Sequence, residues 1–350
     1  MQRSIEQIVS EIVEATDCYL KIPAVVGYEK PLLDHLYEDY QALGYDAIRS
    51  DNIVRVSGNS PESAYLSAHV DRHGIVSIGK GDYRYAAHAI KNYKYDENEA
   101  AEALSQLEGI CEQFETEHVY AYGRWTGEEI TTGSVDHCHY CTKRSNLVFR
   151  IKDMEVMPEG IPVAYRHDKL DKGNGYLSGQ IDNVMSVGLI YGLFKAGFQG
   201  TAIFTTEEEI GKSWKHLSLF FNQQGIETDQ LLVLDTSPYD SSEPADSGKV
   251  VLRNRDSFGS FNISLVETLK QSATSLDIPI DIKDETLRAQ GKKDDQLGRT
   301  ELGRIIHENK GRWTGATVQI PTFNYHTNKE STTKLAIENV LKLLITNLRI

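Results

Sequence analysis

The sequence is poor in cysteine, with four in 350 residues. A chain of this length with so few is not expected to depend on a disulfide framework. Cys18 and Cys111 fall within helical patterns, so we predict that they are packing residues. The other two lie in DHCHYC (136–141), which resembles half a zinc site but lacks a second pair at suitable spacing. We predict a reduced loop there, with a structural zinc site or a redox pair as the alternatives.

Long hydrophobic runs are also missing. The most apolar stretch, MSVGLIYGLF (185–194), is too short to span a bilayer. The N-terminal stretch MQRSIEQIVSEIVEATD carries acids every few positions and has no uninterrupted apolar segment, so a signal peptide is not expected. We therefore expect a cytoplasmic protein with no membrane partner.

Basic residues are in the minority, with 37 Lys and Arg against 51 Asp and Glu and a net charge of −14. The chain has no long Lys/Arg run that could supply a phosphate-binding face, which argues against a nucleic-acid partner. The excess of acid is compatible with cation binding, although most acidic side chains only solvate a surface. Hydrophobic residues make up 40% and charged residues 25%, values that argue against wholesale disorder.

Apolar strand-like runs alternate with helical patterns in both terminal parts of the chain. TAIFTT (201–206) and QLLVLDTS (230–237) are apolar without alternation, as expected for strands buried on both faces. This order predicts the α/β class, with a mostly parallel sheet flanked by helices. Apolar spacing predicts helices over the ranges 3–20, 30–43, 181–197, 263–276 and 334–348.

Residues 75–174 differ in character. They contain short strand-like runs separated by Gly, Pro and charged turns, together with an acidic helix predicted over 96–119. We therefore expect a catalytic domain of residues 1–74 and 175–350. A smaller β-rich domain, residues 75–174, is inserted in it.

Side chains that can bind metal stand at the ends of apolar strands. His69 and Asp71, in SAHVDRHG, are two apart on a strand and so share a face. A carboxylate that holds the second ring nitrogen of a histidine commonly fixes the metal-binding tautomer. Asp182, in GQIDNVMS, stands at the start of an apolar helix, where an N-terminal cap is the alternative role.

Three adjacent acids follow another strand in TTEEEIG (205–211). Adjacent carboxylates can point in opposite directions, so one can bind a metal while its neighbour takes a proton from water; an exposed acidic loop is the alternative. Asp235 and His326 also end β-like apolar runs, the place where α/β proteins put ligand sites, although turn or capping roles remain alternatives. Together these residues fit a two-metal site with one bridging carboxylate. The mixed set of His and carboxylate suits zinc, cobalt or manganese better than calcium.

At these residues the sequence resembles the co-catalytic metallo-aminopeptidases of the tetrahedral-aminopeptidase and glutamyl-aminopeptidase type. The resemblance covers nearly the whole chain and rests on SAHVDRHG, GQIDNVMS, FTTEEEIG, LVLDTS and TVQIPTFNYHTNKES, in the family's order. It implies a zinc-peptidase-like fold and a hydrolase that releases N-terminal residues from peptide substrates with two divalent metal ions, zinc foremost. Because the family's insert mediates assembly, it also implies a homo-oligomer formed through the inserted domain.

The resemblance further implies a role for each matching residue. The first metal would be held by His69 and Asp235, the second by Glu209 and His326, and both by a bridging Asp182. Glu208 would be the general base, and Asp71 would orient the ring of His69. Glu207 falls on a variable position and receives no role. The chain departs from the family at Arg72 and His73, where an acid and an apolar residue are usual, and at GRTELG (298–303), where Gly-Thr-Asp-Ala is frequent.

Two other classes of function share these ligands. Related metal-dependent carboxypeptidases and amide deacylases use similar folds, and a metal-stabilised scaffold needs the ligands without the chemistry. The presence of Glu208 favours an enzyme, since a scaffold has no use for a general base.

Overall fold

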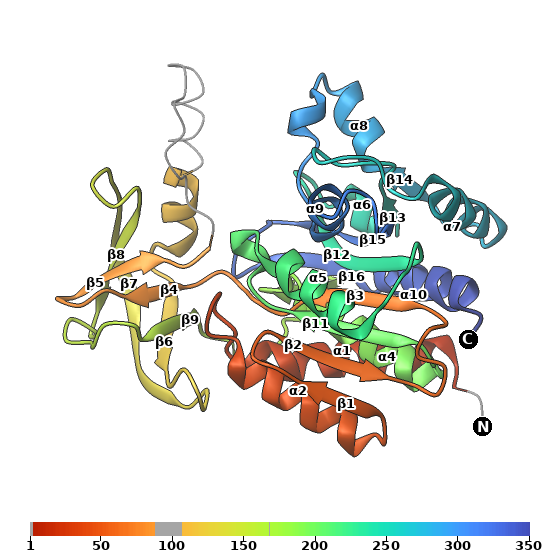
Figure 1. Cartoon of the computed structure of the whole chain (residues 1–350). Helices are drawn as coiled ribbons and strands as arrows, with labels where there is room; N and C mark the ends of the chain where they lie inside the picture. The colour runs from red at the N-terminus through yellow and green to blue at the C-terminus, as the bar shows by residue number, and fades with distance from the viewer. Residues whose placement is uncertain (1–2, 88–106, 168) are drawn as a thin grey trace. The chain divides into compact units, whose positions relative to one another are not determined.

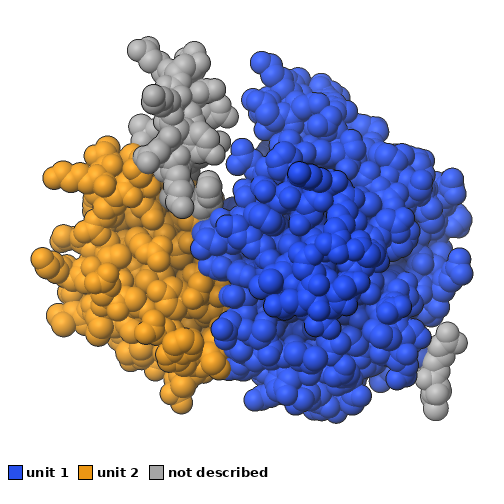
Figure 2. All heavy atoms as spheres, viewed as in Figure 1, with its two compact units in different colours: residues 1–20, 33–70, 169–350 blue, residues 21–32, 71–168 orange. Residues whose placement is uncertain are grey.

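The computed structural model describes residues 3–87, 107–167 and 169–350. The chain forms two compact units (Figure 2). Unit 1 comprises Met1–Leu20, Leu33–Val70 and Lys169–Ile350, and unit 2 comprises Lys21–Leu32 and Asp71–Asp168. Unit 1 is of the α/β type and unit 2 is a smaller β-rich barrel, which confirms the predicted fold class. Among the described helices, none is both long enough and apolar enough to cross a membrane.

Unit 1 is built on a sheet that has ten strands in the described part of the chain (Figure 1). The main order is β1-β2-β11-β3-β12-β15-β13-β14, and β16 joins β15 to β10. The strands are β1 (Asp46–Arg49), β2 (Ile53–Ser57), β3 (Tyr65–His69), β10 (Tyr176–Gly179), β11 (Thr201–Thr205), β12 (Leu231–Tyr239), β13 (Val250–Leu252), β14 (Ile280–Ile282), β15 (Gly315–Phe323) and β16 (Glu330–Thr333).

The four central strands, β11, β3, β12 and β15, run parallel to one another. Their carboxyl ends therefore share one edge of the sheet, where α/β folds place their ligands. Every residue of β11 is buried, as its uninterrupted apolar run predicted for a strand covered on both faces. Every residue of β3 is buried as well. The sheet is antiparallel on either side of this core, at the pairs β2–β11 and β13–β15.

Helices pack on this sheet in two groups. The helices α4 and α10 contact each other and reach β3, β12 and β15, whereas α5 and α9 contact each other and reach β11 and β15. Gly188 in α4 lets α1 approach closely, since a Cβ there would lie 2.2 Å from Thr16 Oγ1. The helices are α1 (Ile5–Lys21), α2 (Lys30–Ala42), α4 (Val184–Ala196), α5 (Ser213–Gln224), α6 (Glu243–Asp246), α7 (Ile263–Ser275), α8 (Lys283–Ala289), α9 (Glu301–Glu308) and α10 (Lys334–Leu348).

Unit 2 contains a closed antiparallel barrel of order β4-β5-β8-β7-β6-β9. Buried aromatic rings fill it, and Phe114 stacks on Tyr165 with ring centroids 4.5 Å apart. The strands are β4 (Ile75–Ser77), β5 (Asp82–Tyr85), β6 (His118–Tyr122), β7 (Glu129–Cys141), β8 (Asn146–Lys152) and β9 (Pro162–Tyr165).

The acidic helix predicted over 96–119 is only partly within the described residues. Residues 107–114 are helical, and 96–106 lie outside the described part of the chain. The predicted C-terminal end is wrong, because Thr116 adopts a positive φ of 64° and β6 already begins at His118. A left-handed residue cannot continue a right-handed helix, so the chain turns there into the barrel.

The predictions for the cysteines of unit 2 are wrong in two respects. DHCHYC is not a loop, because it forms the end of strand β7. Cys138 is bonded to Cys111, which the sequence had suggested was only a packing residue. A strand rises about 3.3 Å per residue and alternates its side chains, so Cys138 and Cys141 face opposite sides and cannot pair with each other. The residues 107–114 bring Cys111 within reach, 27 positions away in the sequence.

Candidate metal centre

The predicted metal ligands of unit 1 gather at the carboxyl edge of the parallel strands. His69 is the last residue of β3, and its partner in register on β11 is Thr205, two residues before the acid run. On the other side of β3, strand β12 is in register up to the pair Val233–Ser67. Two further residues along both strands bring Asp235 beside His69. The parallel register thus places two acid-bearing segments on either side of one histidine.

Asp182 lies between the two histidines. Its Oδ1 is 3.4 Å from His69 Nε2, and its Oδ2 is 3.4 Å from His326 Nε2. Asp182 is not the cap of the following helix, since α4 begins at Val184 and Asn183 occupies the N-cap position. Asn183 Nδ2 donates to the carbonyl of Leu234, which ties this segment to β12 beside Asp235. The capping alternative for Asp182 is therefore excluded.

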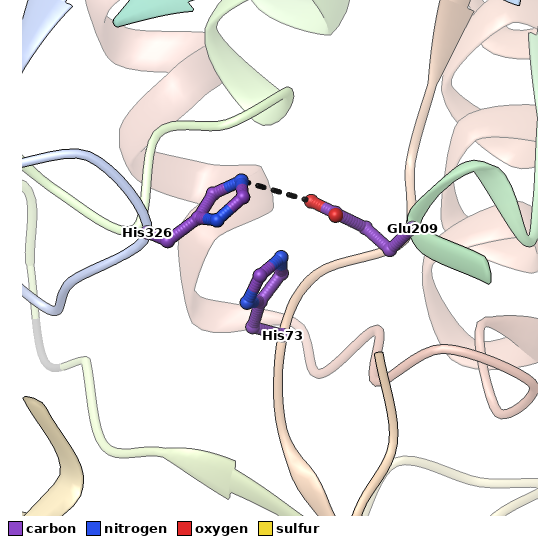
Figure 3. Close-up of side chains that lie close together, drawn as sticks. All are labelled: His73, Glu209 and His326. Carbon is purple, nitrogen blue, oxygen red and sulfur yellow. Dashed lines mark ion pairs between the residues drawn. The ribbon is translucent and has the colours of Figure 1, made fainter. Parts of the chain in front are cut away.

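Asp235 and Glu209 extend the cluster at its two ends. Asp235 Oδ1 is 3.5 Å from His69 Nε2. Glu209 Oε1 is 3.9 Å from His326 Nε2, the pair joined by the dashed line in Figure 3. The order of groups is therefore Asp235, His69, Asp182, His326 and Glu209. The structure brings together all five residues that the sequence singled out as ligands. His73, also drawn in Figure 3, belongs to unit 2.

The spacing of these atoms is that of ligands around a small cation. His69, Asp182 and Asp235 each offer one ligand atom, and these atoms lie within 4.8 Å of one another. Two ligand atoms about 2.0–2.1 Å from a tetrahedral zinc ion are about 3.3 Å apart. The separations of 3.4 and 3.5 Å around His69 are close to this value and exceed those of ordinary hydrogen bonds. The residues present thus fit a divalent metal ion.

The electrostatics of the cluster point the same way. Burial by itself raises the pKa of a carboxyl group, yet His326 and His69 hold the pKa of Asp182 well below its usual range. Burial raises the pKa of Asp235, against the pull of His69, and the charge of Asp182 adds to the rise. Carboxylates that crowd together out of water need a compensating positive charge, and a metal ion supplies it.

Glu330 and Tyr325 were not singled out by the sequence, yet both lie against this cluster. Glu330 is fully buried, and its Oε2 accepts a hydrogen bond of 3.0 Å from the backbone N–H of Asp182. Burial and the nearby charge of Asp182 raise the pKa of Glu330 well above its usual range. The ring of Tyr325 stacks on His326 with centroids 3.6 Å apart. The one sequence signal for them was position, since Tyr325 comes just after β15 and Glu330 begins β16.

The acid run forms a tight turn rather than an exposed loop. Glu208–Ile210 is a short 3-10 helix between two left-handed residues, Glu207 and Gly211. The N–H of Gly211 donates to the Glu208 carbonyl at 2.6 Å. The positive φ of Gly211 favours glycine, and a Cβ there would lie 2.7 Å from the guanidinium of Arg304, which would have to move.

Glu207, the first acid of the run, is neutralised within the protein. The imidazole of His216, with Lys212 beside it, lowers the pKa of Glu207 to about 2 despite partial burial. Because Glu207 has Lys212 and His216 as partners, the crowding of three carboxylates is relieved at one end. Only the other two acids of the run remain for metal chemistry.

The GRTELG stretch leads into α9 and binds the strands that end in the cluster. Glu301 is buried and accepts hydrogen bonds from Ser67 Oγ at 2.6 Å and Thr205 Oγ1 at 2.8 Å. Ser67 belongs to β3 and Thr205 ends β11, so one carboxylate joins the two strands just before His69 and the acid run.

Asp71 is fully buried two residues beyond His69 and is assigned to unit 2. Glu208 is half-buried in the 3-10 turn beside Glu209.

Solved structures of similar fold include aminopeptidases. An aminopeptidase from the archaeon Desulfurococcus kamchatkensis has a TM-score of 0.71 and 14% identity, covering 97% of this chain and 95% of that one. A TET aminopeptidase from a marine sediment archaeon of the Thaumarchaeota has a TM-score of 0.70 and 15% identity, covering 97% and 96%. The Pyrococcus horikoshii TET1 peptidase has a TM-score of 0.65 and 17% identity, covering 95% and 98%. At these identities the likeness shows a shared fold.

Family membership rests on the sequence. No curated protein sequence matches the chain. The family model of the M42 glutamyl aminopeptidases matches residues 154–343, which is more than half of the chain and includes four of the five candidate ligands. The chain therefore belongs to the M42 glutamyl aminopeptidase family, as its motifs predicted, and is a hydrolase of the metallo-aminopeptidase type.

Proposed function

We propose that this protein is a two-metal aminopeptidase that releases N-terminal residues from peptides. The observation that carries the proposal is the position of Asp182, whose two oxygens each lie 3.4 Å from a different histidine. A carboxylate so placed can serve two cations at once, as the bridging ligand of a co-catalytic pair does.

The remaining ligands divide between the two ions. His69 and Asp235 would hold the first ion, and Glu209 and His326 would hold the second, because each pair lies beside a different oxygen of Asp182. The mixed set of imidazole and carboxylate donors favours zinc, with cobalt or manganese as substitutes. When bound, the two ions supply the positive charge that makes water a nucleophile at neutral pH and polarises the scissile carbonyl.

Glu208 is the general base in this proposal. It accepts a proton from the attacking water and later delivers it to the departing amine, a role open to a carboxylate held at the edge of a metal site. Asp71 orients the ring of His69 by accepting a hydrogen bond from the nitrogen that does not face the metal. The free α-amine of the substrate would be bound by a metal ion or by a nearby acid, which would restrict cleavage to the N-terminus.

We also propose that the protein works as a homo-oligomer, assembled through the inserted β-rich domain of residues 75–174. The support is the fold shared with the TET1 peptidase of Pyrococcus horikoshii, which is described as assembling into a tetrahedron or a large octahedral shell. Size-exclusion chromatography with light scattering measures the mass directly. A monomeric mass at micromolar concentration contradicts this part of the proposal.

The reaction is tested with matched substrates. A panel of peptides with free N-termini, including acidic first residues, is compared with the same peptides N-acetylated, before and after removal of metal by a chelator. We expect hydrolysis of the free peptides alone, lost with the metal and restored by zinc. Preference for the acetylated peptides would instead identify an amide deacylase, and release from the C-terminus a carboxypeptidase.

The role of Glu208 is tested separately from metal binding. Glu208→Gln should retain two metal ions per chain yet lose about a hundredfold or more of kcat, as expected for removal of a general base. Full activity in this variant contradicts the assignment. If the wild-type chain with both metals loaded cleaves nothing in a broad peptide library, a scaffold role replaces the enzyme.

A further inference from the structure

The first acid of TTEEEIG is more tightly engaged than its variable position suggested. Glu207 Oε1 lies 3.0 Å from Lys212 Nζ, and its Oε2 lies 2.9 Å from His216 Nε2. Both oxygens of the carboxylate are thus bound, one by the ammonium group of Lys212 and the other by the imidazole of His216. The side chains of Glu207 and His216 are largely shielded from solvent, with 19% and 17% exposed, so water competes weakly for the contact between them. The Lys212 side chain is more open, with 47% exposed.

The backbone of Glu207 needs such support. Its φ is 61° and its ψ is 27°, which is the left-handed region. Residues with a Cβ are disfavoured there, and they persist in it only when surrounding contacts hold them. This residue directly precedes Glu208, so its φ and ψ set the direction in which the next two carboxylates leave the chain.

The partners of Glu207 come from the start of the next helix. Lys212 is the N-cap residue of α5, and His216 lies in its first turns. The backbone N–H of Lys212 also donates to the carbonyl of Glu207 at 2.9 Å. One residue is therefore tied to α5 at three points, two through its carboxylate and one through its backbone, and α5 itself packs on α9 and β11.

We propose that Glu207, with Lys212 and His216, forms a clamp that positions Glu208 and Glu209 for metal-assisted hydrolysis. Glu207 is a positioning residue and touches neither substrate nor metal. The clamp holds the left-handed turn, and the turn aims one following acid at the metal pair and the other at the attacking water. This inference rests on the roles proposed above for Glu208 and Glu209.

The test separates the side chain from the backbone. Glu207→Asn keeps a residue that tolerates the left-handed region but is too short to reach both partners. Glu227→Ala is the matched control, since Glu227 makes an exposed ion pair with Arg312 in the same unit. Each variant is examined for kcat and KM, for metal ions per chain, and for hydrogen exchange of the segment 205–212.

We expect Glu207→Asn to lower kcat about tenfold or more while KM stays within about twofold, since a misplaced catalytic group costs turnover more than binding. We also expect faster exchange in 205–212 and a weaker second metal site. Glu227→Ala should match the wild type in every readout. A Glu207→Asn protein with wild-type kcat and wild-type exchange overturns the proposal.

Further variants test the clamp independently of Glu207→Asn. Should Glu207→Asn not fold, Lys212→Met and His216→Gln each remove one partner and are read in the same way. The double variant Glu207→Asn/His216→Gln should lose no more kcat than Glu207→Asn, because both substitutions remove the same interaction and their effects are not additive. Additive losses of kcat contradict the clamp. If the wild type proves not to be a peptidase, faster exchange in 205–212 and loss of the second metal still support the clamp, and their absence overturns it.

Discussion

Asp182 presents its Oδ2 to His326 Nε2 at 3.4 Å, while its other oxygen faces a second histidine. His326 follows β15 and Asp182 precedes α4, so the fold must be complete before the two can meet. In the proposed function, this carboxylate joins the two metal sites. Its loss should therefore affect both sites at once.

The first prediction concerns this bridge. Asp182→Asn replaces a charged group with two equivalent oxygens by a neutral amide with one, which cannot bridge two cations. We expect loss of at least one metal ion per chain and a fall in kcat/KM of about a thousandfold, equivalent to ~4 kcal/mol. Metal analysis and peptide assays measure the two effects. The exposed control Asp229→Asn should change neither, and an Asp182→Asn protein with two tightly bound ions refutes the bridge.

The second prediction concerns Glu301, which joins β3 and β11 through Ser67 and Thr205. Glu301→Ala leaves two buried hydroxyls without their acceptor, and each hydrogen bond to a charged group contributes about 1.5–3 kcal/mol. We expect the free energy of unfolding to fall by about 2 kcal/mol or more, measured by urea denaturation. Glu301→Gln keeps one acceptor oxygen and should lose less. Equal losses in the two variants contradict the pairing.

The third prediction concerns pH and the barrel of unit 2. Burial, with the charge of Glu155 adding to it, raises the pKa of Tyr83 to about 12. Its hydroxyl donates to the Met154 carbonyl at 2.6 Å, which requires the protonated form. Because the pKa of Tyr83 is higher in the folded protein, its contribution to stability is fully present below the unfolded pKa of about 10. This contribution is lost as the pH rises through the folded pKa of about 12. Tyr83→Phe should therefore be less stable than the wild type at pH 8, and this deficit should shrink between pH 10 and 12.

Thermal melts at pH 8, 10, 11 and 12 measure the effect. Tyr140→Phe is the control, because Tyr140 is only half-buried on β7. A deficit for Tyr83→Phe that stays constant across this range shows that the hydroxyl proton does not contribute.

The fourth prediction concerns the disulfide. Cys18 and Cys141 keep their thiols, so alkylation of unfolded, unreduced protein should label two cysteines, and all four after reduction. Cys111→Ser should destabilise unit 2 by about 3 kcal/mol, from the loop entropy of a 27-residue separation. Four labelled cysteines without reductant contradict the bond. The same count on protein from acid-quenched cells shows whether the bond forms in vivo.

Much of the site followed from local patterns. His69 ends β3 and His326 follows the end of β15. Asp235 ends only the apolar run within β12, which continues to Tyr239, and the parallel strands bring these positions to one edge. That argument needs only strand identity and direction, both of which uninterrupted apolar runs reveal. It predicted which acids and imidazoles would meet, although not which of them would face which.

Other features were beyond those patterns. The bond between Cys111 and Cys138 was missed because its helix and strand meet only in the closed barrel of unit 2. The buried Glu330 was not singled out, since nothing near it in the sequence shows that β16 lies between β15 and β10. In both cases the deciding contact joins elements whose pairing local periodicity does not encode.

The acid run shows the same division on a small scale. The sequence by itself determined that three carboxylates would follow β11, because the strand run ends at Thr205 and the acids begin at Glu207. Only the tertiary structure decided that they are unequal. The start of helix α5 brings Lys212 and His216 to Glu207, and β15 leads to the histidine that faces Glu209. Charge in the sequence sets what each residue can bind, whereas packing sets which partner arrives.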